Sequence, residues 1–484
     1  MEHSEEFSLT QNAGLVGISK LVNILGLLAA SMILTRVLTR AEYGNYEQVW
    51  LVYNSFLPLV GYGLSSAIYF FSAREDRRSV YSAAAVGATV IGILTGIVLA
   101  ILAPAIARWF NSDALTDYIR IFAAYAVLSS PSLMFESVFV TEKKVGLLLL
   151  GNILLASLFA GAVLVSAVVF HSLTVVFISI AVVGAAKSLF LFSFLIRKKH
   201  LTGKKLSPVL KAQLVYALPI LISSITGMIS RQVDRYLVTL FFSPGQFAVY
   251  AIGSKEIPMI AVITGSASAV LFPVFSKFWS LEMRGKFVEV WRNSISKTGL
   301  FLLPMMVFLL FAAKDFMGFF FGEKYVVSAG IFRIFLLLLP MRLAFYSQAL
   351  FALGKQKLYM YTAIVEMFMS GVASYFMMRA YGLEGAAIGK VIVSYLQVIF
   401  LVAALVTLLK TNLREFFPWV KIFKILFISV FGLVPLFFLR EYIANVYFRF
   451  SAEAGLFAVV FIVTAILTKS VRVINLKKLQ FVVN

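Results

Sequence analysis

Long apolar stretches alternate with short polar breaks along the whole chain. Most of these stretches far exceed the roughly 10 residues of a membrane barrel strand, and they lack its strict alternation. A backbone in lipid must satisfy its own hydrogen bonds, and a helix of about 20 apolar residues does so while crossing the bilayer. The pattern predicts fourteen transmembrane helices, over residues 14–35, 45–73, 81–107, 118–140, 146–170, 173–196, 209–240, 247–275, 298–313, 329–353, 358–379, 386–409, 416–439 and 454–467.

The composition supports a membrane protein. Of the 484 residues, 61% are hydrophobic and 13% are charged, and the mean hydropathy is +0.94. Soluble domains are about 45–50% apolar and about 25% charged, so a soluble enzyme, a disordered chain and a fibrous protein are excluded. The chain has no cysteine, and its three histidines, at positions 3, 171 and 200, are far apart. We therefore expect no disulfide and no metal site.

The net charge of +21 is explained by membrane topology. The basic loop residues fall mainly on one side: 23 lie in one set of loops and 5 in the opposite set, namely Arg36, Arg40, Lys314, Lys324 and Arg449. An excess of Lys and Arg marks the cytoplasmic side. We expect a multi-pass protein of the cytoplasmic (inner) membrane with both termini in the cytoplasm, although the N-terminal tail is acidic. The charge then indicates anionic lipid as a partner and no nucleic acid.

Signatures of catalysis are missing from the sequence. It contains no GxxxxGK[ST] phosphate-binding loop, no HExxH and no GxSxG. No loop exceeds about 22 residues, which leaves no room for a soluble domain. We therefore expect a protein that is not an enzyme, with no catalytic residue and no bound cofactor.

The chain contains an internal repeat. At an offset of 204 positions Tyr46 corresponds to Tyr250, and at an offset of 213 the segment 119–122 corresponds to 332–335. Six predicted helices separate the copies, which gives both copies the same orientation about an axis along the membrane normal. We expect an all-α polytopic membrane protein of about fourteen helices. Its predicted parts are an N-lobe (1–203), a C-lobe (204–410) after a basic linker (197–208), and an extra helix pair with a cytoplasmic tail (411–484).

Two sequence motifs point to a known family. Residues 33–46 read ILTRVLTRAEYGNY, a short arginine-containing loop followed by Gly-x-Tyr at the entry to the second helix. With the two-lobe architecture, this segment resembles the opening of the polysaccharide-exporter and O-antigen-flippase branch of the multidrug/oligosaccharidyl-lipid/polysaccharide (MOP) exporter superfamily. Residues 231–237, RQVDRYL, are similar to the Asp-Arg element that ends the seventh helix of that branch.

Two other branches of the superfamily fit less well. The lipid II flippase branch is similar in its number of helices, but its arginine-rich signature in the first helix is absent here. Many multidrug exporters carry an acidic, ion-binding pattern in the first helix, whereas the first helix of this chain offers Lys20 and no carboxylate.

The resemblance implies a flippase or exporter that moves a lipid-linked oligosaccharide, bearing a diphosphate, across the cytoplasmic membrane by alternating access. The implied partners are membrane lipid, the lipid-linked oligosaccharide, a polysaccharide polymerase and glycosyltransferases. The energy source would be a coupling ion, H⁺ or Na⁺, or the membrane potential.

Two alternatives stay open. One is a cation-coupled multidrug or metabolite antiporter, which a pair of carboxylates that titrates with transport would favour. The other is a nontransporting membrane scaffold of an envelope-polysaccharide synthesis complex, which normal function after loss of every cavity charge would favour.

Ionisable residues inside the predicted helices form the candidate site, because each costs at least a few kcal/mol in the bilayer. Seven cations face five acids, so two cations remain for an anionic substrate group even if every acid takes one. The candidate substrate-binding residues are Arg342, Lys187, Lys20, Arg231, Arg235, Lys255 and Lys390, and the candidate coupling or gating residues are Asp234, Glu47, Glu136, Glu366 and Glu256.

Arg342 and Lys187 are the strongest candidates, because they lie near the middle of their predicted helices. Neither has an acid three or four positions away in its own helix, which is the spacing of side chains that meet. Each must therefore borrow a carboxylate from another helix or bind an anion.

Mutual neutralisation is the alternative for several other charges. Asp234 lies three positions after Arg231 and directly before Arg235, so one acid faces two bases on one helix. Lys255 and Glu256 are neighbours and could form a pair of their own.

Polar and small residues also recur at helical spacing in several predicted helices. Such stripes are expected to face a neighbouring helix or a watery cavity rather than lipid. The clearest are Ser19, Asn23, Gly26 and Ala30 in the first helix, Glu366, Ser370 and Ser374 in the eleventh, and Lys390, Ser394 and Gln397 in the twelfth.

Overall fold

The computed structural model describes residues 2–60, 62–201 and 206–468, apart from the side chains of residues 2–14, 58–60, 62, 222–223 and 226. Within these ranges, α-helices and three short 3-10 helices are the only regular secondary structure. The chain divides by its internal packing into two compact units, unit 1 (Met1–Ala251) and unit 2 (Ile252–Asn484). The predicted linker residues 202–205 and the predicted tail at 469–484 lie outside the described residues.

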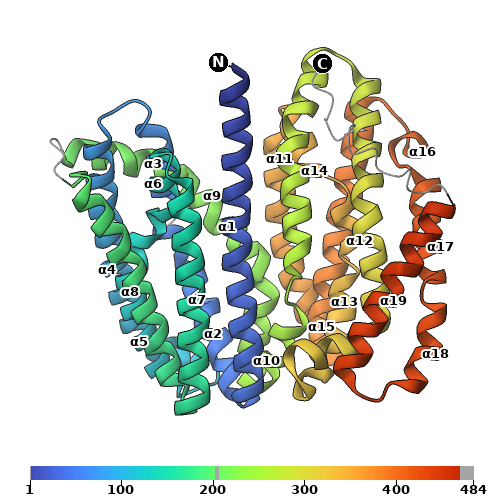
Figure 1. Cartoon of the computed structure of the whole chain (residues 1–484), viewed down its shortest axis with the longest axis horizontal. Helices are drawn as coiled ribbons and strands as arrows, with labels where there is room; N and C mark the ends of the chain where they lie inside the picture. Colours follow the sequence, from blue (N-terminus) through green and yellow to red (C-terminus); the bar gives the residue numbers. More distant parts are fainter. Residues whose placement is uncertain (1, 61, 202–205, 469–484) are drawn as a thin grey trace. The chain divides into compact units, whose positions relative to one another are not determined.

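Unit 1 is a bundle of long helices with several short segments between them (Figure 1). α1 lies along α7, and α5 lies between α4 and α8. The elements are α1 (Glu2–Val37), α2 (Arg40–Val60), α3 (Tyr62–Phe71), α4 (Arg77–Trp109), α5 (Leu115–Ser129), η1 (Ser130–Met134), α6 (Phe135–Thr141), α7 (Val145–Phe170), α8 (Leu173–Arg197), α9 (Leu206–Phe241) and α10 (Pro244–Gly253).

The internal repeat reappears in the way two helices begin. At the start of α2, the backbone N–H of Thr39 donates to Glu42 and the N–H of Glu42 donates back to Thr39 Oγ1. At the start of α10, Ser243 and Gln246 form the same reciprocal bonds. Such capping boxes satisfy N–H groups that lack a partner in the first helical turn. The two boxes are 204 positions apart, which is the offset found in the sequence.

α9 belongs to unit 1, where it packs against α2, α3 and α4. Close backbone approach requires glycine at two places. A Cβ on Gly63 would lie 2.7 Å from the Cβ of Ala217, and a Cβ on Gly44 would lie 1.8 Å from the carbonyl oxygen of Pro244. The packing therefore divides the chain after α9, whereas the repeat predicts a lobe boundary before it. That boundary, at residues 203 and 204, stays a prediction.

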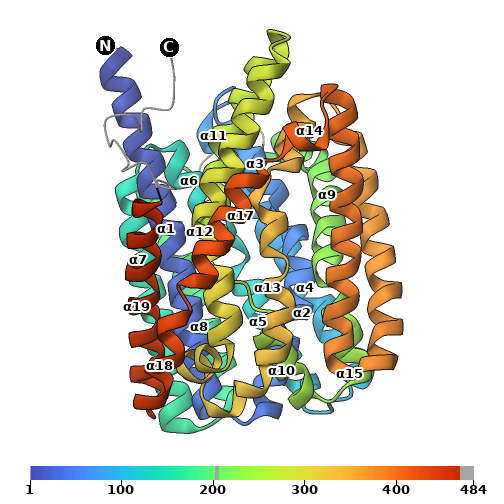
Figure 2. The ribbon, with the colours of Figure 1, turned by 90° about the vertical axis from the view of Figure 1, so that its right-hand side faces the viewer.

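Unit 2 is organised around α12, which packs against α11, α17 and α19 (Figure 2). Its elements are α11 (Pro258–Ser280), α12 (Arg284–Phe321), η2 (Glu323–Ser328), α13 (Ala329–Leu336), η3 (Leu339–Leu343), α14 (Tyr346–Ala352), α15 (Gln356–Leu409), α16 (Leu413–Phe416), α17 (Trp419–Phe431), α18 (Val434–Tyr442) and α19 (Val446–Leu467).

Several helices predicted to be continuous are broken. The helix predicted at 247–275 is interrupted before Pro258, because a residue that precedes proline disfavours helical geometry. The helix predicted at 329–353 bends by 48° between α13 and α14, where η3 contains Pro340. α15 covers two predicted helices and breaks at Tyr381 and Gly382. Gly382 has φ +61°, which glycine adopts without steric cost.

Many long helices present large apolar side chains on their outer surfaces, as helices in lipid do. Ile101 on α4, Val169 on α7 and Phe427 on α17 are 70%, 65% and 74% exposed. Among the described residues, ten helices are long and apolar enough to cross a membrane, or eleven if the bent pair counts as one span. The protein is thus an all-helical multi-pass membrane protein, as predicted. The count of fourteen helices is not confirmed, partly because α15 counts once in that total.

Candidate functional site

Two predicted cations and one predicted acid come together in unit 1. Lys20 Nζ on α1 lies 2.9 Å from Glu136 Oε1 on α6, and these side chains are 59% and 43% exposed. Lys187 Nζ on α8 lies 5.3 Å from the ring centroid of Phe135, the residue before Glu136. The charges of Lys187 and Glu136 are close enough to interact. We call Lys20, Glu136 and Lys187 the Lys20 cluster. In this cluster two cations share one carboxylate.

Packing around the Lys20 cluster holds its helices in place. Asn152 on α7 donates a hydrogen bond to Ser19 Oγ, and Gly26 lets the backbone of α1 approach Ala156. The predicted stripe on the first helix therefore faces a neighbouring helix, and Lys20 lies at the edge of that contact. The Phe135 ring is buried and packs against Phe139, with ring centroids 4.7 Å apart. A buried Phe135 leaves the next side chain, Glu136, directed away from the core.

Glu47 and Asp234 are buried in unit 1, and each is bound by a tyrosine hydroxyl. Tyr43 Oη donates to Glu47 Oε1 at 2.7 Å, and Tyr250 Oη donates to Asp234 Oδ2 at 2.6 Å. Arg235 Nη1 lies 3.9 Å from Glu47 Oε2. Both acids are enclosed and already hydrogen-bonded. Their contacts link α2, α9 and α10.

The salt bridge predicted along α9, between Asp234 and Arg231 or Arg235, is not formed among the described residues. Asp234 is engaged by Tyr250, and Arg235 reaches Glu47 and the carbonyl oxygen of Ala251. Arg231 is exposed. Of the residues that the structure describes, none forms an ion pair with it. Arg231 therefore stays a candidate for binding an anion.

In unit 2, Arg342 on η3 forms an ion pair with Glu256, which lies in the break between α10 and α11. Both side chains are nearly half exposed. Two outcomes were predicted for Arg342, an ion pair with a carboxylate of another element or binding of an anion. The structure shows the ion pair. The predicted Lys255–Glu256 pair is replaced, because Glu256 binds Arg342. Lys255 Nζ lies 6.0 Å from the ring centroid of Phe321.

Lys390 and Glu366 form a buried ion pair in α15. Lys390 Nζ lies 2.8 Å from Glu366 Oε1, and the side chains are only 12% and 9% exposed. Ser394 Oγ also donates to Glu366 at 3.3 Å, and Ser374 Oγ donates to the carbonyl oxygen of Ala386 at 2.9 Å. The stripes predicted on the eleventh and twelfth helices therefore face each other across the break in α15.

A second buried charge network in unit 2 was not predicted. Arg440 bonds to Asp315 Oδ2 at 2.8 Å and to Glu453 Oε1 at 2.7 Å, and Arg449 also binds Asp315. The network ties α18 and α19 to α12. Asp315 and Glu453 lie just outside the helices predicted at 298–313 and 454–467. Both predicted helices are too short, because α12 continues to Phe321 and α19 begins at Val446. Longer boundaries would have placed both acids inside the membrane and marked them as candidates.

The predicted site residues are thus distributed over several groups within the two units. Unit 1 holds the Lys20 cluster and the group around Glu47, and unit 2 holds the Arg342 and Lys390 pairs. In the residues the structure covers, no three His, Asp or Glu side chains gather as a metal site requires. The arrangement provides charge for binding.

The fold is that of MOP-superfamily transporters. The chain is similar to the lipid II flippase MurJ in an inward closed conformation, with a TM-score of 0.73, 15% sequence identity and coverage of 95% of this chain and 99% of that chain. It is also similar to an inward-facing multidrug resistance MATE family transporter, with a TM-score of 0.66, 17% identity and coverage of 81% and 96%. A MOP superfamily transporter from Pyrococcus furiosus matches with a TM-score of 0.56, 16% identity and coverage of 84% and 96%.

The family itself is shown by sequence. A family model described as polysaccharide biosynthesis protein matches residues 33–330, which is more than half of the chain. The chain therefore belongs to the polysaccharide biosynthesis protein family, in agreement with the resemblance found in residues 33–46 and 231–237. No individual curated protein matches the chain in a sequence comparison.

Proposed function

We propose that this protein is a flippase that moves a lipid-linked, diphosphate-bearing oligosaccharide across the cytoplasmic membrane by alternating access. The family, the transporter fold and the many lipid-facing helices support transport of a membrane-embedded substrate rather than catalysis. The family's link to polysaccharide biosynthesis supports a sugar-bearing cargo.

The observation that carries the proposal is the ratio of charges in the Lys20 cluster. Lys20 forms an ion pair with Glu136, and Lys187 lies 5.3 Å from the ring of the neighbouring Phe135, so the cluster holds two lysines and one carboxylate. Lys20 and Glu136 are about half exposed, so an incoming anion could reach them. A phosphate group would supply the missing negative charge, and charge-assisted hydrogen bonds to it are worth about 1.5–3 kcal/mol each.

The test is reconstitution of the purified full chain into vesicles with a defined lipid-diphosphate oligosaccharide. Flipping is measured as the fraction of labelled sugar that a lectin added outside can reach. We expect flipping of the diphosphate substrate and none of a matched glycolipid without phosphate. Equal transport of both lipids, or transport of neither, would overturn the proposal.

The energy source is expected to be the membrane potential or a coupling ion. A negative-inside potential drives an anion outward by about 2.3 kcal/mol per charge per 100 mV. Outward flipping of a dianion should therefore slow when the potential is collapsed with an ionophore. An unchanged rate would mean that the moving protein neutralises the substrate charge or that a chemical gradient alone drives transport.

The proposed orientation places both termini in the cytoplasm. Tags after His200 and after Asn484 should both be protected in right-side-out vesicles, while a tag within residues 111–116 should be accessible. Opposite sides for the tags at His200 and Asn484 would contradict the count of fourteen helices.

A further inference from the structure

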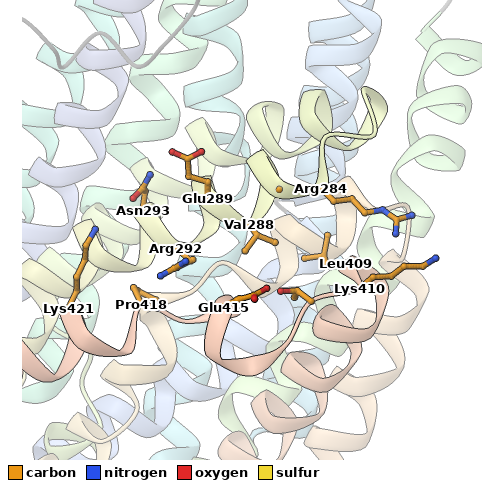
Figure 3. A pocket seen from close by; sticks show the side chains of 12 residues that line it. Arg284, Val288, Glu289, Arg292, Asn293, Leu409, Lys410, Glu415, Pro418 and Lys421 are labelled. Carbon is orange, nitrogen blue, oxygen red and sulfur yellow. The ribbon is translucent and has the colours of Figure 1, made fainter.

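A pocket of about 550 Å³ lies in unit 2, and its lining contains none of the candidate site residues named above (Figure 3). Its charged lining residues come from three places in the chain: the first turns of α12, the end of α15, and the segment around α16 and the start of α17. They are Arg284, Glu289, Arg292, Lys410, Glu415 and Lys421.

Packing beneath the pocket gives it a defined wall. The ring of Phe416 on α16 is buried and stacks on the buried Trp291 of α12, with centroids 4.8 Å apart. Trp419 Nε1 donates to the carbonyl oxygen of Leu413 at 3.1 Å, and Asn412 caps α16. These contacts fix the backbone of the 410–418 segment against α12.

The charges of the pocket do not neutralise one another. Four cations and two carboxylates give a formal charge of +2. Across the ranges that the structure describes, no ion pair joins any of these four cations to Glu289 or Glu415. Figure 3 shows Arg284 and Lys410 at one end of the pocket and Lys421 at the other, with Arg292 between them. Positive charge is thus spread along the pocket and suits an elongated anion with two charged groups.

The pocket lies where membrane-spanning helices leave the apolar layer. α15 ends at Leu409 and the span that contains α17 begins at Trp419, so Lys410 and Lys421 are at helix ends. Along α17, Val420, Phe423 and Phe427 are 82%, 62% and 74% exposed, at positions that share one helical face. A basic pocket next to an exposed apolar face matches the two parts of a phospholipid. Basic pockets between membrane helices bind anionic headgroups in this way.

We propose that this pocket binds an anionic phospholipid whose headgroup carries two phosphates. The phosphates contact the cations of α12, α15 and α17, and the acyl chains lie along the exposed face of α17. The headgroup charge of −2 matches the pocket charge of +2. This site is distinct from the Lys20 cluster and does not rest on the proposed transport activity.

The test measures lipid binding to the detergent-purified full chain by native mass spectrometry. The probes are cardiolipin with two phosphates, phosphatidylglycerol with one, zwitterionic phosphatidylethanolamine, and inorganic pyrophosphate. We expect cardiolipin to bind at least tenfold more tightly than phosphatidylethanolamine, with phosphatidylglycerol between them. Binding of pyrophosphate as tight as that of cardiolipin would overturn the lipid assignment, because it would show a site for a free anion.

Variants that remove positive charge and variants that remove negative charge from the pocket test where the lipid binds. Replacing Arg292 and Lys421 with glutamine should weaken cardiolipin binding at least tenfold, and Glu289→Gln with Glu415→Gln should tighten it severalfold. Lys286→Gln is the matched control, because Lys286 is an exposed cation in the first turn of α12 that does not line the pocket. Loss of binding in the control equal to that in the pocket variants would overturn the proposal, as would tight binding unchanged by any of them. Melting temperatures of all variants identify any that fail to fold.

Discussion

The Lys20 cluster of unit 1 and the Lys390–Glu366 pair of unit 2 put similar charges to different uses. In the cluster, two lysines share one carboxylate, and Lys20 and Glu136 are 59% and 43% exposed. In the pair, one lysine meets one carboxylate, and both are about nine-tenths buried. Both groups were predicted from the same rule, that a charge inside a membrane helix has a function.

We expect exposure and charge ratio to distinguish residues that bind a ligand from residues that hold the structure together. A buried one-to-one pair is complete in itself, and its loss leaves a charge in an apolar environment. The exposed Lys20–Glu136 pair gains little stability from its attraction, and Lys187 adds a second cation beside it. The comparison supports the proposal that Lys390 and Glu366 belong to the framework of unit 2 and that Lys20 and Lys187 bind the substrate.

The largest effect is expected at the buried pair. Glu366→Gln removes the carboxylate opposite Lys390, which should cost about 3–5 kcal/mol of folding free energy. The amount and melting temperature of the purified protein should fall clearly. A double variant, Glu366→Leu with Lys390→Leu, should recover most of the loss, because no charge is then left buried. A single variant as stable as the parent would show that this pair is not structural.

Lys187 should show the opposite behaviour. Lys187→Met is expected to reduce flipping of the diphosphate lipid by roughly tenfold to a hundredfold, the equivalent of about 1.5–3 kcal/mol for one charge-assisted bond. The melting temperature should stay the same or rise, because burial of this charge is no longer needed. Lys187→Arg, which keeps the charge, should restore part of the rate. A lowered melting temperature with unchanged flipping would move Lys187 to the structural group.

Removal of the shared carboxylate sharpens the comparison further. Glu136→Gln leaves Lys20 and Lys187 without the acid between them, so binding of a diphosphate lipid should tighten by up to about fivefold, within the 0.2–1 kcal/mol typical of exposed pairs. Turnover should fall, because tighter binding slows release. Equilibrium binding and flipping rates measured on the same preparation separate the two effects. Weaker binding in this variant would show that Glu136 holds the lysines in position rather than competing with the substrate.

The smallest effect on stability is expected when the exposed Arg342–Glu256 pair is removed. Arg342→Ala should change the free energy of unfolding by less than about 1 kcal/mol, because both partners are nearly half exposed. If Arg342 also grips phosphate through two nitrogens, Arg342→Lys should recover little of any lost flipping. A large loss of stability in Arg342→Ala would place this pair beside Lys390–Glu366 instead.

The sequence was sufficient for the helical architecture and for some pairings, but not for partners brought together by folding. Apolar runs located most helices, and the Glu366 and Lys390 stripes correctly indicated a helix–helix contact. The partner of Lys20 could not be read from spacing, since Glu136 is more than a hundred positions away and reaches it only through the packing of α1, α6 and α7. The pair predicted between the neighbours Lys255 and Glu256 is not formed, because Glu256 lies in the break before Pro258 and binds Arg342.

The contact between Gly44 and Pro244 has a consequence for biogenesis. These residues lie about two hundred positions apart, yet a Cβ on Gly44 would overlap the backbone of Pro244. α2 is synthesised and inserted into the membrane long before α10. The first turn of α2 therefore lacks its packing partner while several helices are inserted. Unit 1 is complete only when α9 and α10 arrive. A chain interrupted after its sixth predicted helix would therefore leave this surface of α2 without its partner.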